Sequence, residues 1–214
     1  MLPIFPDSRQ IPGCQTVDPP LSLPPVKPLP LVLATLLMPA LPALAQITAD
    51  LAIAEGGAPL GTLTIELDHL NAPVATANFI GLATGKFPWI DSTTGVVRYN
   101  KPYYNGIIFH RVVAGFMNQT GSQKGDGSDG PGYSFPDAPE TSNGLTHASG
   151  YVVSMSNSGP NTYWSQMFST VAPANHVIGE HIVFGSVAEG SSGTVAETID
   201  ARHVLVSDGP EGSR

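Results

Sequence analysis

The sequence has little cysteine and little positive charge, and each shortage excludes some classes of function. Cys14 is the one cysteine in 214 residues and lies in the first 45, so a mature protein without them has no disulfide and no redox chemistry. Lys and Arg number 9 against 17 Asp and Glu, which gives a formal net charge of −8. Nucleic acids and anionic membrane surfaces attract basic patches, so neither is an expected partner.

The sequence also lacks an apolar run long enough to cross a membrane. The run LVLATLLM, at 31–38, follows Lys27 and precedes Ala43-Leu44-Ala45, which has the small-x-small form of a signal-peptidase site. We therefore expect residues 1–45 to be a cleaved signal peptide with an atypical N-terminal extension, rather than an uncleaved anchor. Residues 46–214 are then one exported domain, periplasmic or secreted, without membrane attachment.

Motifs for metal binding and hydrolysis are missing as well. The isolated histidines, His147 among them, lack the paired spacing of zinc ligands, and no serine lies in a G-x-S-x-G elbow. The aspartates of GDGSDG, at 125–130, lack the later glutamate of a calcium-binding loop. His110 is more simply a packed strand residue than a catalyst. We expect neither a metal nor a cofactor.

Glycine and proline are abundant instead, with 23 and 21 residues, and short runs of Val, Ile, Thr and Tyr lie between them. This pattern is typical of an all-β domain with many turns. It predicts strands at 47–55, 61–68, 106–113, 116–121, 148–157, 163–171 and 181–189. Helices are predicted at 71–85 and 190–200, capped by Asn71 and by Ser191 or Ser192. Their expected apolar sides are Val74, Ala77, Phe79 and Leu82 in the first helix, and Val195 and Ile199 in the second. The connection 86–105 is long enough for a small hairpin.

One charge lies where an apolar residue is expected. Arg111, one of five arginines, is inside the strand-forming stretch FHRVVAGFMNQTG. An unpaired buried charge is heavily penalised, so this guanidinium has to meet water, a carboxylate or a ligand. Period two places Met117 with Gln119 on one side of a strand, and Gln166 with Phe168 on one side of another. If these strands adjoin, the face favours a ligand site, whereas a solvated arginine over ordinary core residues is the alternative.

Several blocks of the sequence are similar to those of one family. FHRVVAGFMNQTG, GPGYSF at 130–135, SMSNSGPNTYWSQMF at 154–168 and HIVFGSV at 181–187 resemble the cyclophilin family of peptidyl-prolyl cis-trans isomerases, EC 5.2.1.8. The order and spacing agree, and the likeness covers about residues 47–200. The resemblance implies a mainly β fold, an antiparallel eight-stranded barrel capped by two helices. It also implies a cofactor-free enzyme that rotates X-Pro bonds and, in an exported protein, assists folding.

The resemblance further implies roles for individual residues. Arg111 is the catalytic arginine, braced by Gln119, and a bound peptide is what its charge meets. An apolar pocket holds the prolyl ring, and polar residues beside it bind the substrate backbone. The residues implied for substrate binding are Phe116, Met117, Gln119, Ser156, Asn157, Gln166, Phe168, His176, Val177 and His181.

The chain departs from the family pattern at three places. His176 replaces a tryptophan that contributes to cyclosporin binding, so we expect weak or no cyclosporin binding with activity retained. GSQ, at 121–123, replaces the usual Gly-Asp, which changes the local turn. The segment after residue 200 is short, so the strand that closes the barrel against the first one is expected to be missing through C-terminal truncation. Such a truncation would leave the barrel with an open edge, which invites aggregation. The alternative is that HVLV, at 203–206, is itself a shortened closing strand.

The expected partners are proline-containing peptides and unfolded client proteins, and a monomer is expected. A non-catalytic proline-peptide binder or chaperone on the same scaffold is the main alternative. Arg111 argues against it, whereas a missing closing strand argues for it. A structural protein whose sheet binds nothing is a third possibility, which the density of matching residues disfavours.

Overall fold

The computed structural model describes residues 45–137 and 144–202. The chain divides into two units, Met1–Ala43 and Leu44–Arg214, and all described residues belong to the second. The apolar run of the expected signal peptide and the segment HVLV therefore lie outside the described residues. Within the described ranges, no helix has the length and apolar character needed to cross a membrane.

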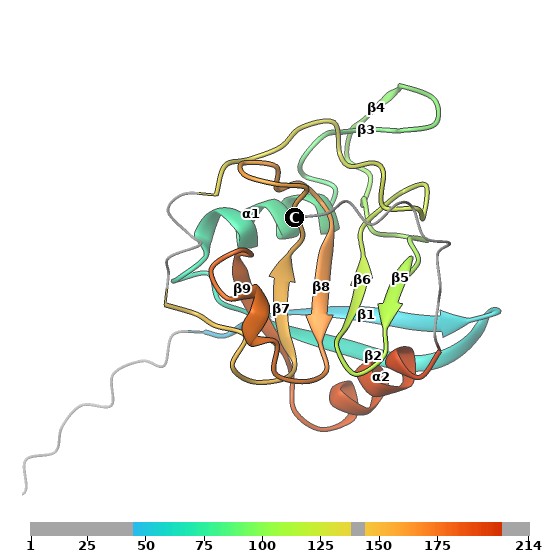
Figure 1. Ribbon diagram of the computed structural model, residues 1–214. Coiled ribbons are helices and arrows are strands. Elements are labelled where there is room, and N and C mark those ends of the chain that lie inside the picture. The colour runs from blue at the N-terminus through green and yellow to red at the C-terminus, as the bar shows by residue number, and fades with distance from the viewer. Residues whose placement is uncertain (1–44, 138–143, 203–214) are drawn as a thin grey trace, which may run out of the picture. The chain divides into compact units, whose positions relative to one another are not determined.

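Seven strands form one antiparallel sheet in the order β1-β2-β9-β7-β8-β6-β5 (Figure 1). Their bounds are β1 Ile47–Glu55, β2 Ala58–Leu67, β5 Arg111–Val113, β6 Met117–Thr120, β7 Val152–Met155, β8 Met167–Thr170 and β9 Val183–Val187. In Figure 1, β1 and β2 cross the other strands, so the sheet curls into a half-barrel. The mainly β, antiparallel fold with two helices is as predicted.

The edges of this sheet are β1 and β5, which do not pair with each other. The expected eight-stranded barrel is thus represented, in the described part of the chain, by seven strands of the main sheet. Three strands are also much shorter than predicted: only Arg111–Val113 of 106–113, Val152–Met155 of 148–157 and Met167–Thr170 of 163–171 form strands. The first of these segments begins with a turn instead. Gly106 has a φ of 79°, and the N–H of Ile107 donates to the carbonyl of Tyr104 at 3.2 Å. The chain therefore turns here before it enters the sheet.

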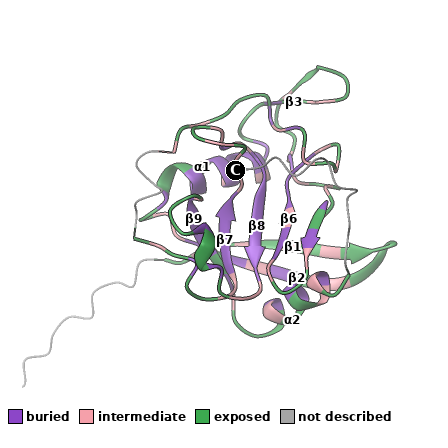
Figure 2. Cartoon of the chain, viewed as in Figure 1, coloured by how far each residue is buried: buried purple, intermediate pink, exposed green. Residues whose placement is uncertain are grey.

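The core lies inside the curled sheet. Leu63, Ile65 and Leu67, alternate residues of β2, are at most 2% exposed. They pack with inward residues of β7, β8 and β9 and of both helices, including Val153, Met155, Met167, Phe184, Phe79, Val195 and Ile199. Figure 2 shows this as buried strands at the centre and exposed surface on the protruding loops. Burying each large apolar side chain contributes about 1.5–3 kcal/mol, so this cluster also fixes the strand register.

Helix α1, Pro73–Ala83, begins with proline in its first turn as predicted, but its cap and its phase differ from the prediction. Its N-cap is Ala72, without a side-chain cap, and the Asn71 amide instead donates to the Asp68 carboxylate at 2.8 Å. Val74 is 48% exposed, and Ala77 is also exposed. The buried side consists of Ala75, Thr76, Asn78, Phe79, Gly81 and Leu82. Packing against the sheet, rather than the apolar residues alone, sets the rotation of the helix.

Helix α2, Ser191–Asp200, was predicted at the right place with Val195 and Ile199 buried, and both are. Its expected serine cap is wrong. The N-cap is Gly190, with a φ of 86°, and no side chain caps the helix. Ser192 is buried instead, where its hydroxyl accepts the N–H of Thr64 at 3.1 Å. The serine therefore ties the helix to β2.

The connection 86–105 carries the small hairpin that its length predicted. Strands β3, Trp89–Ile90, and β4, Val97–Arg98, pair antiparallel and protrude from the main body (Figure 1). Between β8 and β9 the chain forms a short 3₁₀ helix, η2, at Asn175–Val177. It places His176 at the surface and buries Val177.

Candidate functional site

Four strands place chemistry-bearing side chains in one row. Arg111 of β5 pairs with Gln119 of β6. Gln119 in turn pairs with Phe168 of β8, which pairs with Ser154 of β7. Directly paired residues of an antiparallel sheet share a face, so these four lie on one side of the sheet, called here the arginine face. Val112, the next residue after the arginine, is in the core on the opposite side. The arrangement expected from period two is confirmed.

The guanidinium of Arg111 is open to solvent. Arg111 is exposed, and among the described residues no hydrogen bond or ion pair to its side chain is seen. Gln119 was expected to brace it, but its Nε2 lies 3.1 Å from Ser156 Oγ and 3.0 Å from Gln166 Oε1. The strand pairing, rather than a side-chain bond, therefore holds Arg111 in place. Its charge remains available to a ligand.

Gln166 connects the arginine face to the glycine-rich loop that follows β6. The residue is 2% exposed, and its Nε2 donates to the carbonyls of Gly127 at 2.8 Å and Asp129 at 2.9 Å. Ser122, part of the unusual GSQ turn, donates its hydroxyl hydrogen to the Asp129 carboxylate. The same hydroxyl accepts the N–H groups of Gly125 and Gly127, each at 3.1 Å. These bonds fix the loop against the wall of the site.

Phe168 forms the apolar floor and is enclosed by two histidines. The His181 ring meets it edge-on at 5.1 Å between centroids, and the His147 ring stacks on it at 5.9 Å with an interplanar angle of 13°. Met117 and Phe168 are only 2% and 5% exposed. Little of the surface of these two side chains is therefore open on this face.

The rim of the site is formed by Phe116 and His176. Phe116 is half-buried, and its ring centre lies 4.8 Å from that of the exposed His176. Val177, beside it, is buried at 9% exposure. Sequence reasoning placed all three around the pocket. The structure brings Phe116 and His176 into contact.

Ser156 and Asn157 were expected to bind the substrate backbone, and in the structure their side chains hold neighbouring groups. Ser156 accepts the hydrogen bond from Gln119 described above. Asn157 donates to the carbonyl of Glu180 at 2.8 Å, and its amide lies 3.5 Å from His181 Nδ1. His181 Nδ1 also lies 3.2 Å from the carbonyl oxygen of Met155. Asn157 therefore helps to orient the ring that packs on the floor.

His147 is part of this site although sequence reasoning did not assign it there. It is 1% exposed, and its Nε2 lies 2.7 Å from Ser154 Oγ. Burial, together with the charges of His181 and His176, lowers the pKa of His147 to about 4. Burial likewise lowers the pKa of His181. His147 precedes β7 in an irregular segment, where no strand or helix period predicts which way its side chain points. His110, expected as a packed strand residue, is indeed buried, at 2% exposure, but it lies just before β5 rather than in a strand.

Comparison with known proteins identifies the family of this site. Residues 49–209, well over half of the chain, match the family described as "Cyclophilin type peptidyl-prolyl cis-trans isomerase/CLD". The chain belongs to this family. The chain is 39% identical to peptidyl-prolyl cis-trans isomerase B of Streptomyces anulatus over 141 residues, 66% of this chain and 79% of that protein.

Two other relatives give similar agreement. Peptidyl-prolyl cis-trans isomerase A of Mycobacterium tuberculosis is 38% identical over 152 residues, 70% of this chain and 81% of that protein. Peptidyl-prolyl cis-trans isomerase-like 1 of Aspergillus fumigatus is 40% identical over 134 residues, 61% of this chain and 72% of that protein. The predicted cyclophilin family is therefore confirmed.

A cleft of about 390 Å³ in this cyclophilin is lined by residues that are near those of the arginine face in the sequence. Ser158 of the cleft directly follows Asn157, and Trp164 lies two residues before Gln166, in the irregular segment that leads into β8. The lining residues are Gly130, Gly132, Tyr133, Ser134, Ser158, Thr162 and Trp164.

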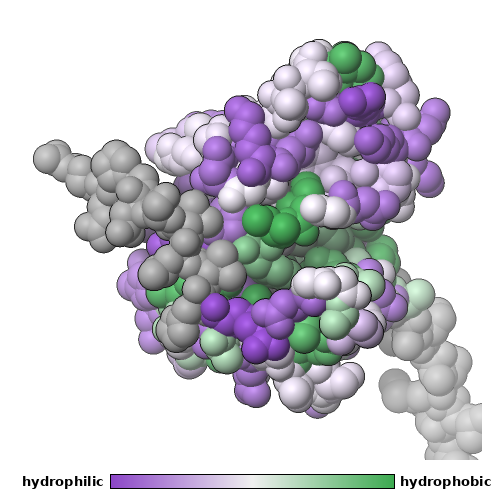
Figure 3. Space-filling model, turned by 90° about the vertical axis from the view of Figure 1, so that its right-hand side faces the viewer, coloured by the Kyte–Doolittle hydropathy of each residue, from purple (hydrophilic) through white to green (hydrophobic). Residues whose placement is uncertain are grey.

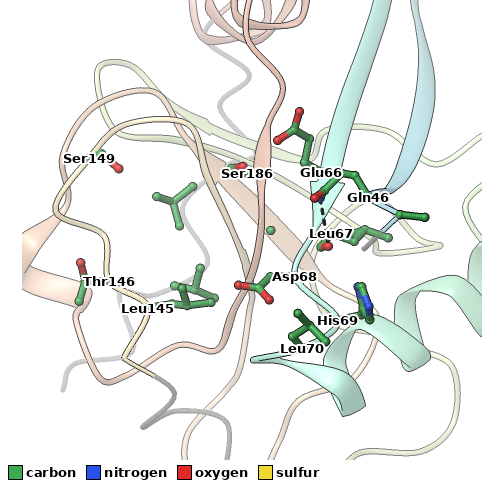
Figure 4. A pocket seen from close by; sticks show the side chains of 14 residues that line it. Gln46, Glu66, Leu67, Asp68, His69, Leu70, Leu145, Thr146, Ser149 and Ser186 are labelled. Atoms are coloured by element: carbon green, nitrogen blue, oxygen red, sulfur yellow. Dashed lines mark hydrogen bonds between the residues drawn. The ribbon is translucent and has the colours of Figure 1, made fainter. Parts of the chain in front are cut away.

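Two other clefts of the cyclophilin domain contain none of the implied substrate-binding residues. One, of about 420 Å³, lies between β2, β9 and residues 145–149, with Glu66 and Asp68 on its wall and no Lys or Arg (Figure 4). The other, of about 520 Å³, lies between β1 and residues 104–109. Figure 3, which views that side of the molecule, shows apolar surface in a hollow between two lobes. Among the described residues, no group of three or more His, Cys, Asp or Glu could hold a metal ion.

Proposed function

We propose that this cyclophilin catalyses cis-trans isomerisation of X-Pro bonds through Arg111 and assists the folding of exported proteins. The observation that carries the proposal is an exposed arginine that has no bonded partner among the described residues, is paired in register with Gln119, and shares a face with the apolar Phe168 on the far side of β6. Water alone could solvate an exposed arginine, but the apolar Phe168 on the same face favours a ligand site. The family of the chain and its relatives support the reaction class.

The proposed reaction requires only a hydrogen-bond donor and an apolar surface, which Arg111 and Phe168 provide. Rotation about an X-Pro bond faces a barrier of roughly 18–20 kcal/mol that amide resonance creates. When the Arg111 guanidinium donates a hydrogen bond to the prolyl nitrogen, the nitrogen shares its lone pair less with the carbonyl, and rotation becomes easier. The donor accelerates the reaction only if it binds the twisted state more strongly than either planar state. A gain of about 7 kcal/mol would correspond to about five powers of ten in rate.

The remaining residues of the site hold the substrate in this geometry. Phe116, Met117, Phe168, Val177 and His181 supply the apolar surface for the prolyl ring, and Ser156, Asn157 and Gln166 border the peptide backbone. Gln119 keeps its neighbours in place through its two hydrogen bonds. No step requires a proton donor, a nucleophile or a cofactor. We expect cyclosporin to bind weakly, because His176 offers less apolar surface than a tryptophan.

The test is the rate of isomerisation by Arg111→Ala, measured on a proline-containing tetrapeptide by NMR exchange between its cis and trans forms. We expect kcat/KM to fall by about 10²–10³-fold, the usual loss when one transition-state donor is removed. Arg202→Ala is the matched control, because Arg202 is an exposed arginine whose partner is Glu55, at 3.0 Å. Circular dichroism should show the same fold for all three proteins.

Two results would contradict the proposal. If Arg111→Ala keeps its activity within about twofold, the arginine is not the catalytic donor. If the unmodified protein binds the tetrapeptide without accelerating its isomerisation, the chain is the non-catalytic proline-peptide binder.

Export to the periplasm or outside the cell is proposed from the sequence, as is a monomeric state. The apolar run at 31–38 and the Ala43-Leu44-Ala45 site support the export. Uncatalysed X-Pro isomerisation takes tens to hundreds of seconds, so it can limit refolding after translocation. N-terminal sequencing of protein isolated from the producing cells should begin at Gln46. A mature chain that retains the apolar run would exclude cleavage at this site.

A further inference from the structure

The β3–β4 hairpin exposes large apolar side chains in a group. Ile90 and Val97 are cross-strand partners and so share one face of the hairpin. Ile90 is 39% exposed, Val97 is 44% exposed, and Tyr99, two residues further along the chain, is 71% exposed. We call these three residues the hairpin face. Grouped apolar side chains on a soluble domain mark a contact surface more often than isolated ones do.

The opposite face of the hairpin is firmly attached to the domain. Trp89 is 5% exposed, its ring lies 5.2 Å from that of Tyr103, and its Nε1 donates to the carbonyl of Lys101 at 2.8 Å. Arg98 Nη2 lies 2.6 Å from the Asp91 carboxylate and holds the pKa of that group well below its usual value. The exposed residues are therefore presented by a fixed support.

The hairpin is also bonded to the loop that borders the arginine face. The N–H of Ile90 donates to the carbonyl of Pro131 at 2.9 Å, and Gln123 Nε2 donates to the carbonyl of Ile90 at 3.1 Å. A Cβ added at Gly132 would lie 2.7 Å from Ile90 Cδ1, so this side chain rests directly on the loop. Gly132 lines the cleft next to the arginine face. The hairpin thus contacts the loop that forms one wall of this cleft.

We propose that the hairpin face is a second contact surface for the client chain and binds large apolar side chains three or more residues away from the proline. The inference rests on the proposed isomerase function and adds a substrate preference to it. The occupant is an extended, uncharged client segment, because the hairpin rests on the loop that Gln166 of the site holds, and the three residues of its face carry no charge. Stretches of this kind are exposed in unfolded chains and are buried after folding, which would direct the enzyme to unfolded clients.

The test compares two twelve-residue peptides that share one X-Pro bond. One carries leucine at the positions three and four residues to either side of the proline, and the other carries serine there. We expect the unmodified enzyme to have a roughly three- to tenfold higher kcat/KM on the leucine peptide, as partial burial of apolar side chains predicts. Val97→Ser should reduce this ratio to near one.

Val96→Ser is the matched control. Val96 is 49% exposed and precedes Val97, so period two directs it away from the hairpin face. It should keep the preference for leucine, and all three proteins should isomerise a tetrapeptide at the same rate, because that peptide is too short to reach the hairpin.

The outcomes separate this proposal from the proposed function. No acceleration on the tetrapeptide would reject the isomerase function itself. Normal activity on the tetrapeptide, with equal rates on both long peptides or with the same effect of Val96→Ser and Val97→Ser, would overturn the hairpin proposal alone. A concentration-dependent dimer that Val97→Ser disperses in sedimentation experiments would also overturn it, because the face would then be occupied by a second copy of the chain.

Discussion

At the scale of single residues, the sequence predicts best those side chains that lie on regular strands. Arg111, Gln119 and Phe168 were expected to share a surface because a strand has a period of two, and the sheet pairing confirms it. The same reasoning could not find His147, because it lies in an irregular segment and reaches Phe168 only through the fold. The unexpected hydrogen bonds of Gln119 have the same cause, since its partners Ser156 and Gln166 lie outside the strands, 37 and 47 positions further along the chain.

His147 gives a residue-scale prediction about pH. Its pKa of about 4 in the folded chain lies below the ordinary value of 6.5. Between these two pH values the imidazole is therefore mostly protonated in the unfolded chain and mostly neutral in the folded chain. Stability should therefore fall as the pH decreases through this window, by roughly 2 kcal/mol between pH 7 and pH 5 from this group. Urea unfolding at both pH values measures the change.

His147→Gln removes this titration, so its loss of stability between pH 7 and pH 5 should be smaller by about the same amount. His110 and His181, whose pKa values burial also lowers, remain in both proteins and contribute to both curves. Equal losses in the two proteins would show that His147 is protonated as easily in the folded chain as in the unfolded one.

At the scale of elements, positions along the chain were predicted better than orientations. Both helices lie where capping residues, proline and glycine indicated them, but Val74 and Ala77 face solvent. Helix α1 is apolar on more than one side, so the sequence does not specify which side faces the sheet. For helix α2 the sequence predicts Ser191 or Ser192 as the cap, because the local pattern does not show that Thr64 of β2 lies within reach of Ser192.

Ser192 therefore gives a prediction at the scale of elements. Ser192→Ala should reduce the free energy of unfolding by about 1 kcal/mol, because the partly buried N–H of Thr64 would lose its partner. Ser191→Ala, at an exposed neighbouring position, should change it by less than about 0.5 kcal/mol. Chemical denaturation of both variants measures the difference. A larger effect at Ser191 would restore the original view that this serine caps the helix.

At the scale of the whole molecule, the first hairpin is attached to the rest of the sheet by a short contact. β2 pairs with β9 only through Ile65 with Val187, Glu66 with Ser186, and Leu67 with Gly185. The sequence predicted both strands but not their contact, since 118 positions separate Leu67 from Gly185 (185 − 67). The half-barrel depends on this junction, because it links the long β1–β2 hairpin to the strands that carry the arginine face.

Gly185 allows the junction to be tested. A Cβ at this position would lie 2.5 Å from the Glu66 carbonyl oxygen, which belongs to the paired backbone and cannot rotate away. Gly185→Ala should therefore push β2 and β9 apart and reduce the free energy of unfolding by about 1–3 kcal/mol, the usual cost of overpacking. Gly193→Ala, in helix α2, is the matched control. Its new Cβ would meet only the Tyr151 ring, at 3.8 Å. It should raise the free energy of unfolding by about 0.5–1 kcal/mol, since alanine favours a helix over glycine. If both substitutions have effects of the same sign and size, the close approach of the two strands does not limit the stability of the half-barrel.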